Sequence, residues 1–166
     1  MTYAELQVTT HYSFLRGASS CEELFAAAAL LGVSALGIVD RNSVAGMVRA
    51  HVAARKTGVR LVPGCRLDLV CGTSLLVWPE DKAGWSRLTR LLTIGKARAD
   101  AQRGEKGQCF LHWEDVEAHA WGLVAALVPD MPDAVTEAAL ALTAGIFGDR
   151  AHLSLSHRRR PGDAMR

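Results

Sequence analysis

The chain lacks a CxxC pair, although it contains four cysteines: Cys21, Cys65, Cys71 and Cys109. Zinc knuckles and thioredoxin-like redox sites are therefore not indicated, because both need closely spaced thiols. Four further motifs are absent: the phosphate-binding loop G-x-x-x-x-G-K-[ST], the dinucleotide turn G-x-G-x-x-G, the nucleophile elbow G-x-S-x-G and the zinc-binding pair H-E-x-x-H. The common nucleotide-binding and hydrolase classes are thus not indicated.

A long apolar run is also missing. The most apolar stretch, residues 24–33, is too short to span a bilayer, and the first ten residues, MTYAELQVTT, have no basic segment followed by an apolar one. The formal net charge of +2 is too small to indicate nucleic-acid binding by composition. We expect a cytoplasmic protein that makes no contact with a membrane.

What the sequence does contain is typical of one globular domain over residues 1–166, with 49% apolar and 22% charged residues. Apolar patterning predicts strands at Tyr3–Thr10, Ala35–Val39, Arg60–Val70, Ser74–Trp78, Gly122–Val128 and His152–Ser156. It predicts helices at residues 19–31, Val44–Thr57, Asp81–Thr93, Trp113–Ala118 and Pro132–Thr143. The alternation favours a mostly parallel α/β fold with its functional residues at the carboxyl ends of the strands.

Two local patterns support these assignments. Ser19 followed by Glu22 predicts a capping box for the first helix, with a buried face made of Leu24, Ala27, Ala28 and Leu31. The turn at residues 71–73 is expected to join two strands whose buried residues are Leu67, Leu69, Leu75 and Val77. The polar segment Gly95–Gln108 is expected to be a mobile surface loop.

The polar candidates for chemistry are His11, Asp40, Arg41, Cys65, Arg66 and Asp68, at the predicted strand ends or near them, and His51, inside a predicted helix. They make a poor catalytic set, because metal hydrolases need several His, Asp or Glu ligands converging on two or three ions. For His11 a solvated loop residue is favoured over a ligand, and for His51 a structural role is favoured.

Three segments of the chain, YAELQVTTHYSFLRGASSCEEL, ALGIVDRNSVAGMVRAH and RLVPGCRLDL, resemble the first three motifs of the PHP (polymerase and histidinol phosphatase) domain of C-family bacterial DNA polymerases. Two later segments, SLLVWPEDKAGWSRLTRLLTIGKARA and HWEDVEAHAWGLVAALVP, look like the error-prone, damage-inducible branch. The resemblance covers roughly residues 3–160. It implies a distorted (β/α)7 barrel, here amino-terminal and incomplete, with a metal cluster at the strand ends.

The resemblance also gives the positions of the metal ligands, and most of them are replaced in this sequence. The family's H-x-H motif corresponds to Gln7 and Thr9, and its acidic loop ligand to Arg16. Its Asp-His pair reads Asp40-Arg41, its G-x-E reads Gly64-Cys65-Arg66, and a later histidine corresponds to Ser74. The resemblance therefore implies a degenerate site without metal or catalytic residues, at Gln7, Thr9, Arg16, Asp40, Arg41, Arg66 and Ser74.

Three arginines, Arg16, Arg41 and Arg66, would point toward the volume that the ions occupy in active relatives. Like charges about 4 Å apart repel by about 4 kcal/mol at an effective dielectric constant near 20, so arginines and divalent ions would compete. The arginines are candidates for anion binding, or for salt bridges with Asp40, Asp68 and Glu5. The salt bridges are favoured, because a buried cation needs a partner and any carboxylate can serve.

By the resemblance, the expected function is that of a structural module of an error-prone polymerase acting in translesion replication, DNA repair and induced mutagenesis. The palm, fingers and thumb are absent, and with them the carboxylates that hold Mg²⁺ for nucleotidyl transfer. Expected partners are the remainder of the polymerase, DNA through the parent, the sliding clamp and mutagenesis accessory proteins. Alternatives are a metal-dependent phosphoesterase or exonuclease and a phosphate-binding α/β protein.

An incomplete barrel is expected to leave strand edges and apolar faces uncovered, and therefore to associate or dissolve poorly in isolation. The basic run His157–Arg160 is expected to be solvated rather than bound to nucleic acid.

Overall fold

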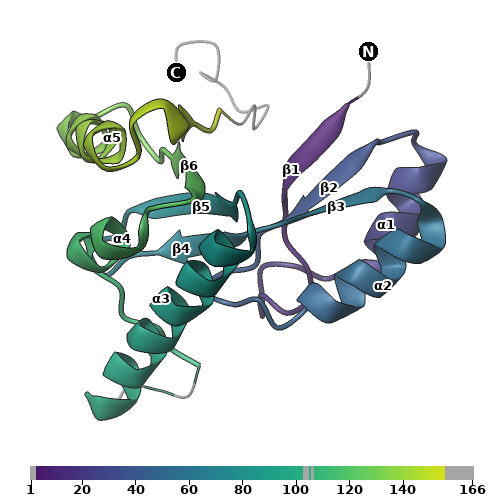
Figure 1. Cartoon of the computed structure of the whole chain (residues 1–166), viewed down its shortest axis with the longest axis horizontal. Coiled ribbons are helices and arrows are strands. Elements are labelled where there is room, and N and C mark those ends of the chain that lie inside the picture. The colour runs from purple at the N-terminus through teal and green to yellow at the C-terminus, as the bar shows by residue number, and fades with distance from the viewer. Residues whose placement is uncertain (1–2, 103–104, 106, 156–166) are drawn as a thin grey trace. The chain divides into compact units, whose positions relative to one another are not determined.

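The computed structural model describes residues 3–102, 105 and 107–155, in which strands and helices alternate along the chain (Figure 1). In chain order the elements are β1 (Ala4–Val8), α1 (Cys21–Leu30), β2 (Ala35–Ile38), α2 (Met47–Thr57), β3 (Arg60–Pro63), β4 (Cys65–Asp68), β5 (Ser74–Pro79), α3 (Lys82–Ala101), α4 (Trp113–His119), β6 (Leu123–Val128), α5 (Ala134–Phe147), a 3₁₀ turn (Gly148–Arg150) and β7 (Ala151–Leu153). The predicted alternation of strands and helices is confirmed.

Contacts divide the chain into two compact units, Met1–Leu67 with Leu76–Pro79, and Asp68–Leu75 with Glu80–Arg166. The prediction of one domain over residues 1–166 concerns both units together and stays a prediction. No helix in the described ranges is both long enough and apolar enough to cross a membrane.

The first unit contains a parallel three-stranded sheet in the order β1-β2-β3. Every residue of β2 is buried, as its uninterrupted apolar sequence predicts for a central parallel strand. The helices α1 and α2 pack against each other and lie on the same side of this sheet (Figure 1). Helix α2 ends at Gly58, whose φ of 77° is in the left-handed region that glycine adopts without strain.

The capping box of α1 is real, but it lies one residue later than predicted. The Ser20 hydroxyl accepts a hydrogen bond from the Glu23 amide at 3.2 Å, and the Glu23 carboxylate accepts one from the Ser20 amide at 2.8 Å. The prediction that Ser19 and Glu22 form this box is therefore wrong. The buried face differs as well, since it consists of Cys21, Phe25 and Ala28.

The predicted single strand Arg60–Val70 is two strands, and β3 and β4 belong to different sheets. Residues 60–66 nevertheless pair with residues 35–41 in a single register. The partners include Ala35 with Arg60, Ile38 with Pro63 and Arg41 with Arg66. The break falls at Gly64, where a Cβ atom would lie 2.8 Å from the Val77 carbonyl oxygen. Strand β3 thus ends and β4 begins at a position where only glycine fits.

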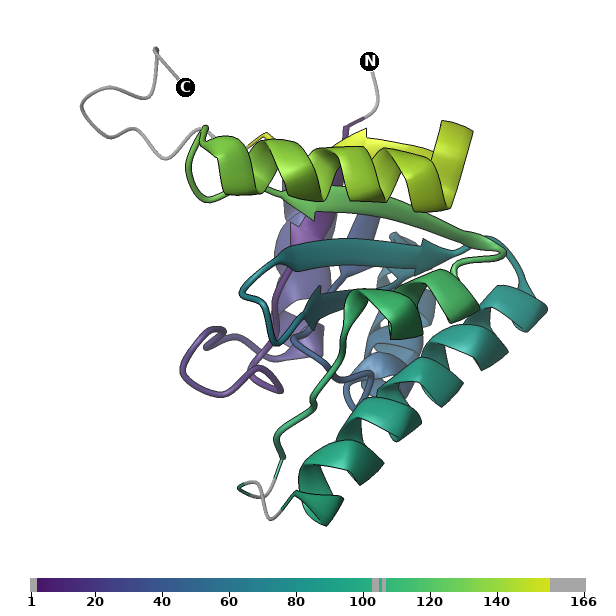
Figure 2. The same cartoon turned by 90° about the vertical axis from the view of Figure 1, so that its left-hand side faces the viewer.

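The second sheet has the strand order β4-β5-β6-β7, with β6 and β7 parallel. Helix α5 packs against β6 and β7 (Figure 2). The four apolar residues predicted to be buried here are buried: Leu67, Leu69, Leu75 and Val77. Strand β7 is shorter than predicted, and both Ser156 and the basic run His157–Arg160 lie outside the described residues.

Helix α3 is longer than predicted and includes the first part of the expected loop at residues 95–108. Gly95 lies inside the helix and is buried, where a Cβ atom would come within 2.6 Å of the Cys109 sulfur and 2.7 Å of Leu111. A glycine that looks like a helix stop in the sequence is therefore a close-packing position. The prediction of a loop over residues 95–101 is wrong for this reason.

Candidate functional site at the end of strand β2

The buried carboxylate of Asp40 is the centre of the candidate site. Asp40 follows β2 and is 1% exposed. Its Oδ1 atom accepts hydrogen bonds from the Thr10 amide at 2.8 Å and the Ser13 hydroxyl at 2.7 Å, and its Oδ2 atom accepts one from the Thr10 hydroxyl at 2.8 Å. Because a buried carboxylate is costly unless it is hydrogen-bonded, these donors account for its place in the core.

The same hydrogen bonds hold the loop that follows β1. The Ser13 amide donates to the Thr10 carbonyl, and the Gly17 amide donates to the Ser13 carbonyl, both at 3.0 Å. The Ser13 hydroxyl also accepts a hydrogen bond from the Arg41 amide at 2.9 Å. At Gly17 a Cβ atom would lie 2.2 Å from the Thr10 carbonyl oxygen, so no larger residue fits there. Asp40 and this loop thus form one fixed structure.

Two of the three predicted arginines are brought side by side by the backbone. Arg41 and Arg66 are partners in an isolated parallel bridge, in which the Arg66 amide donates to the Asp40 carbonyl at 3.0 Å. Both arginines are half-buried, and paired residues of parallel strands direct their side chains to the same face. Arg16 lies on the loop after β1 and is exposed.

The other predicted positions are more dispersed. Gln7 lies in β1, and Thr9 follows it half-buried. Ser74 belongs to the second unit, where its hydroxyl donates to Asp68 Oδ1 at 2.5 Å. Cys65 is buried, with its sulfur 3.3 Å from the Asp40 carbonyl oxygen.

Neither histidine of the candidate set lies in the core. The His11 ring stacks on Tyr12 with centroids 4.6 Å apart, and its Nδ1 atom is 3.2 Å from the Ser19 carbonyl oxygen. Both His11 and His51 are exposed.

Charge at this site also affects a neighbouring thiol. Burial raises the pKa of Cys21, and the negative charge of Asp40 raises it further. The Cys21 sulfur faces the Gly46 carbonyl oxygen at 3.6 Å, so the thiol is a buried donor rather than a metal ligand.

The donors gathered here do not fit a cluster of divalent ions. Such a cluster needs several carboxylates or imidazoles, whereas Asp40 is surrounded by the hydroxyls of Thr10 and Ser13. Within the described ranges, no group of three or more His, Cys, Asp or Glu side chains comes together. No chemical step through a metal is therefore derived for this site.

Thr10 and Ser13 are the two site residues that sequence reasoning missed. Both are nearly fully buried although they lie in a polar loop, and this burial cannot be seen in the sequence. The only available signal was the spacing of two hydroxyl residues in the loop between a strand and a capping box.

Comparison with known proteins places this site in a family. The model of the PHP domain matches residues 5–158, and the chain belongs to the PHP domain family. A protein named error-prone DNA polymerase 2 from Agrobacterium fabrum is 60% identical over 166 residues, and one of the same name from Rhizobium meliloti is 59% identical over 165 residues. An error-prone DNA polymerase from Caulobacter vibrioides is 49% identical over 156 residues. The alignments cover 93% or more of this chain but only about 15% of the Agrobacterium and Rhizobium relatives and 14% of the Caulobacter relative, and the matched part is their amino-terminal PHP region.

Two solved structures share the fold at 14% sequence identity. One is a protein from Bifidobacterium adolescentis described as a candidate metal-dependent phosphoesterase, with a TM-score of 0.69 over 96% of this chain and 79% of the other. The second is an amidohydrolase from Chromobacterium violaceum with bound sulfate and no metal, with a TM-score of 0.68 over 99% of this chain and 80% of the other. At this identity the likeness shows the fold alone, and it confirms the predicted PHP-type α/β architecture.

Proposed function

We propose that this chain is a structural, metal-free PHP module of an error-prone DNA polymerase. The observation that carries the proposal is the state of Asp40, since both oxygens of this carboxylate accept hydrogen bonds from Thr10 and Ser13. A carboxylate used in this way stabilises a loop and has little capacity left for an ion. The names of the similar proteins supply the polymerase part of the proposal.

The role of such a module is to brace the larger polymerase rather than to catalyse. The parent would copy damaged DNA in the cytoplasm, in repair and induced mutagenesis, with Mg²⁺ held by palm carboxylates outside this chain. Its partners would be the rest of the polymerase, DNA, the sliding clamp and mutagenesis accessory proteins.

Anion binding is a second candidate function, favoured by the parallel bridge between Arg41 and Arg66. Two guanidinium groups on one face suit a phosphate or a sulfate, and the Chromobacterium relative in fold has bound sulfate. Each of these arginines already has interaction partners within the chain, so an anion would add to an existing network. Metal-dependent phosphoesterase activity is the third candidate function, and it is supported only by the name of the structurally similar protein from Bifidobacterium adolescentis.

The experiment that tests the structural reading is the metal content of the purified chain by plasma mass spectrometry, with hydrolysis of a phosphate ester in added Mn²⁺ or Zn²⁺. Substoichiometric metal and no turnover are expected. Stoichiometric metal that is lost in Asp40→Asn, but kept in a control Asp149→Asn at an exposed carboxylate, would overturn the proposal.

The polymerase part has its own test at the gene. We expect the reading frame to continue beyond codon 166 into a palm with its carboxylates. A reading frame that stops at codon 166 would contradict the polymerase part of the proposal. It would not affect the conclusion drawn from the metal content.

A further inference from the structure

Helix α3 carries an excess of positive charge. This helix holds five of the nineteen Lys and Arg residues, Lys82, Arg87, Arg90, Lys96 and Arg98, but only one of the seventeen acidic residues, Asp100. The rest of the chain therefore has fourteen basic and sixteen acidic residues, a net charge of −2. A weakly basic protein thus carries a strongly basic helix, and clustering of this kind is what creates a local field.

Over residues 82–96, one side of α3 consists of cations and hydroxyls, and Ala97 and Asp100 lie on the same side in the last turn. We call it the basic face, and it is made of Lys82, Ser86, Thr89, Arg90, Thr93 and Lys96. At 3.6 residues per turn these positions lie opposite the buried side, which consists of Gly84, Leu88, Leu91, Leu92, Gly95 and Ala99. Four of its residues also line an open depression along the helix: Ser86, Thr89, Arg90 and Thr93.

The cations of the basic face differ from the other two on α3. Arg98 forms a two-point ion pair with Asp115, and Arg87 donates to the Trp121 carbonyl at 3.2 Å. Lys82, Arg90 and Lys96 are exposed, and in the part of the chain that the structure describes they have no carboxylate partner. Their charge is therefore available to an external anion.

The hydroxyls of the basic face are short and already satisfied. Each donates to a carbonyl one turn earlier in α3: Ser86 to Lys82 at 3.0 Å, Thr89 to Trp85 at 3.1 Å and Thr93 to Thr89 at 2.9 Å. They leave room between the cations and introduce no negative charge. An anionic polymer can therefore approach the helix closely, held by the cations rather than by the hydroxyls.

The stability of the helix does not account for this pattern. The first turn of α3 has no acidic residue and begins with Lys82, where the helix dipole favours a negative charge by roughly 0.3–1 kcal/mol. The neighbouring Asp81 is used as the N-cap, with its Oδ1 atom 2.6 Å from the Gly84 amide. Interaction with the helix dipole therefore does not explain the presence of Lys82 at this position.

We propose that the basic face of α3 binds the sugar-phosphate backbone of double-stranded DNA without reading its sequence. Lys82 and Lys96 are separated by about 21 Å along the helix, a distance over which one strand of B-DNA presents about six phosphates. The proposal goes beyond the function proposed above, which does not require this chain itself to touch DNA.

The test is the binding of the whole chain to a fluorescein-labelled duplex of about 20 base pairs, measured by anisotropy at increasing salt. Three neutralised phosphates predict a slope of log K against log salt of about −2.7. The triple variant Lys82→Gln, Arg90→Gln, Lys96→Gln is expected to bind at least about tenfold more weakly at about 50 mM salt, with most of the slope lost. A second duplex of unrelated sequence should bind equally well.

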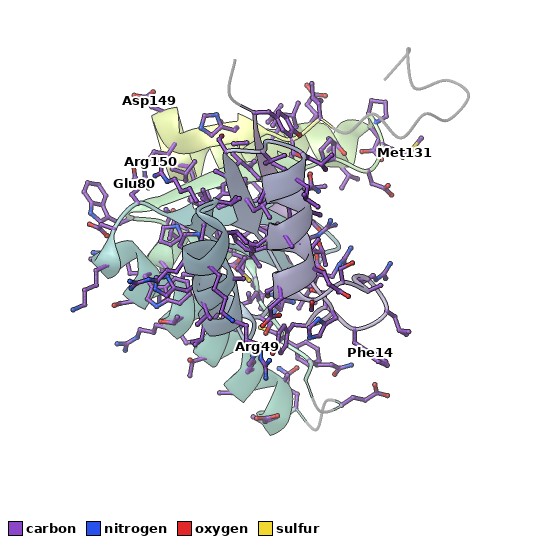
Figure 3. All side chains as sticks on the ribbon, turned by 90° about the vertical axis from the view of Figure 1, so that its right-hand side faces the viewer. Phe14, Arg49, Glu80, Met131, Asp149 and Arg150 are labelled. Carbon is purple, nitrogen blue, oxygen red and sulfur yellow. The ribbon has the colours of Figure 1, made fainter. Side chains whose placement is uncertain are left out.

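A matched control removes three exposed cations from α2, in the variant Arg49→Gln, Arg55→Gln, Lys56→Gln (Arg49 is labelled in Figure 3). Both variants lose the same net charge, so an equal loss of affinity in the two would overturn the proposal. It would also be overturned if the unaltered chain failed to bind or preferred one sequence.

Circular dichroism shows whether the α3 variant keeps its helix content. If it does not, it is replaced by a charge-conserving variant, Lys82→Arg, Arg90→Lys, Lys96→Arg. This second variant must bind the duplex as tightly as the unaltered chain does. The DNA-binding results do not depend on the metal content of the chain or on its reading frame. Failure of the DNA-binding proposal can therefore be distinguished from failure of the proposed function.

Discussion

The carboxylate of Asp40 accepts hydrogen bonds from both the amide and the hydroxyl of Thr10, each at 2.8 Å. This contact ties the residue after β2 to the loop after β1, across a sequence separation that only the tertiary fold closes. The carboxylate of Asp40 thus acts as a structural link between these two segments.

Replacing Asp40 by Asn should destabilise the fold by about 2–3 kcal/mol, because an amide nitrogen cannot accept the hydrogen bond from the Thr10 hydroxyl. The measurement is the urea midpoint followed by circular dichroism. Asp149→Asn is the control, since that exposed carboxylate should be replaceable within about 0.5 kcal/mol (Figure 3). Equal midpoints for the two variants would contradict the role given to Asp40.

Two glycine substitutions should change stability in opposite directions. Gly17→Ala forces a Cβ atom against the Thr10 carbonyl oxygen and should destabilise by about 2 kcal/mol or more. Gly145→Ala, inside α5 with open space around the new atom, should stabilise by roughly 0.5–1 kcal/mol. Both are read from urea unfolding, and a destabilised Gly145→Ala would show that the α5 backbone is not the regular helix described.

The ion pair between Arg98 and Asp115 predicts a dependence of stability on pH. The guanidinium donates to both carboxylate oxygens and lowers the pKa of Asp115 to about 2. Because the folded pKa lies below the ordinary value of about 3.9, the stabilisation is full above that value and is lost as pH falls toward 2. Asp115→Asn should therefore cost about 1 kcal/mol at neutral pH and progressively less between pH 4 and 2. A cost that stays constant down to pH 2 would rule out this linkage.

The four cysteines should react unequally with a thiol reagent at about pH 8. Burial raises the pKa of Cys109 to about 11 and also raises that of Cys21, while Cys65 is buried and Cys71 exposed. One fast-reacting thiol is expected in the native chain and four in denaturant. Cys71→Ser should remove the fast reaction, and a fast phase that survives this change would show that a buried thiol is accessible.

Local patterns predicted much of the secondary structure. The apolar run at residues 35–39 was enough to predict β2, and Gly58 was enough to predict the end of α2. The errors arose where a glycine has two possible roles. Gly95 was predicted to begin a loop, yet it lies inside a long helix, and Gly64 was predicted to lie within one strand, yet it separates two strands that belong to different sheets.

For the candidate site, the sequence by itself determined the residue types at the predicted ligand positions, which are Gln7, Thr9 and Arg66 where the resemblance leads one to expect His and Glu. It also determined the charge of α3, which is a local property of twenty consecutive residues. Only the tertiary structure decided what Asp40 does. Its hydrogen bonds to Thr10 and Ser13 span about thirty residues, and burial of those hydroxyls depends on packing that no local pattern encodes.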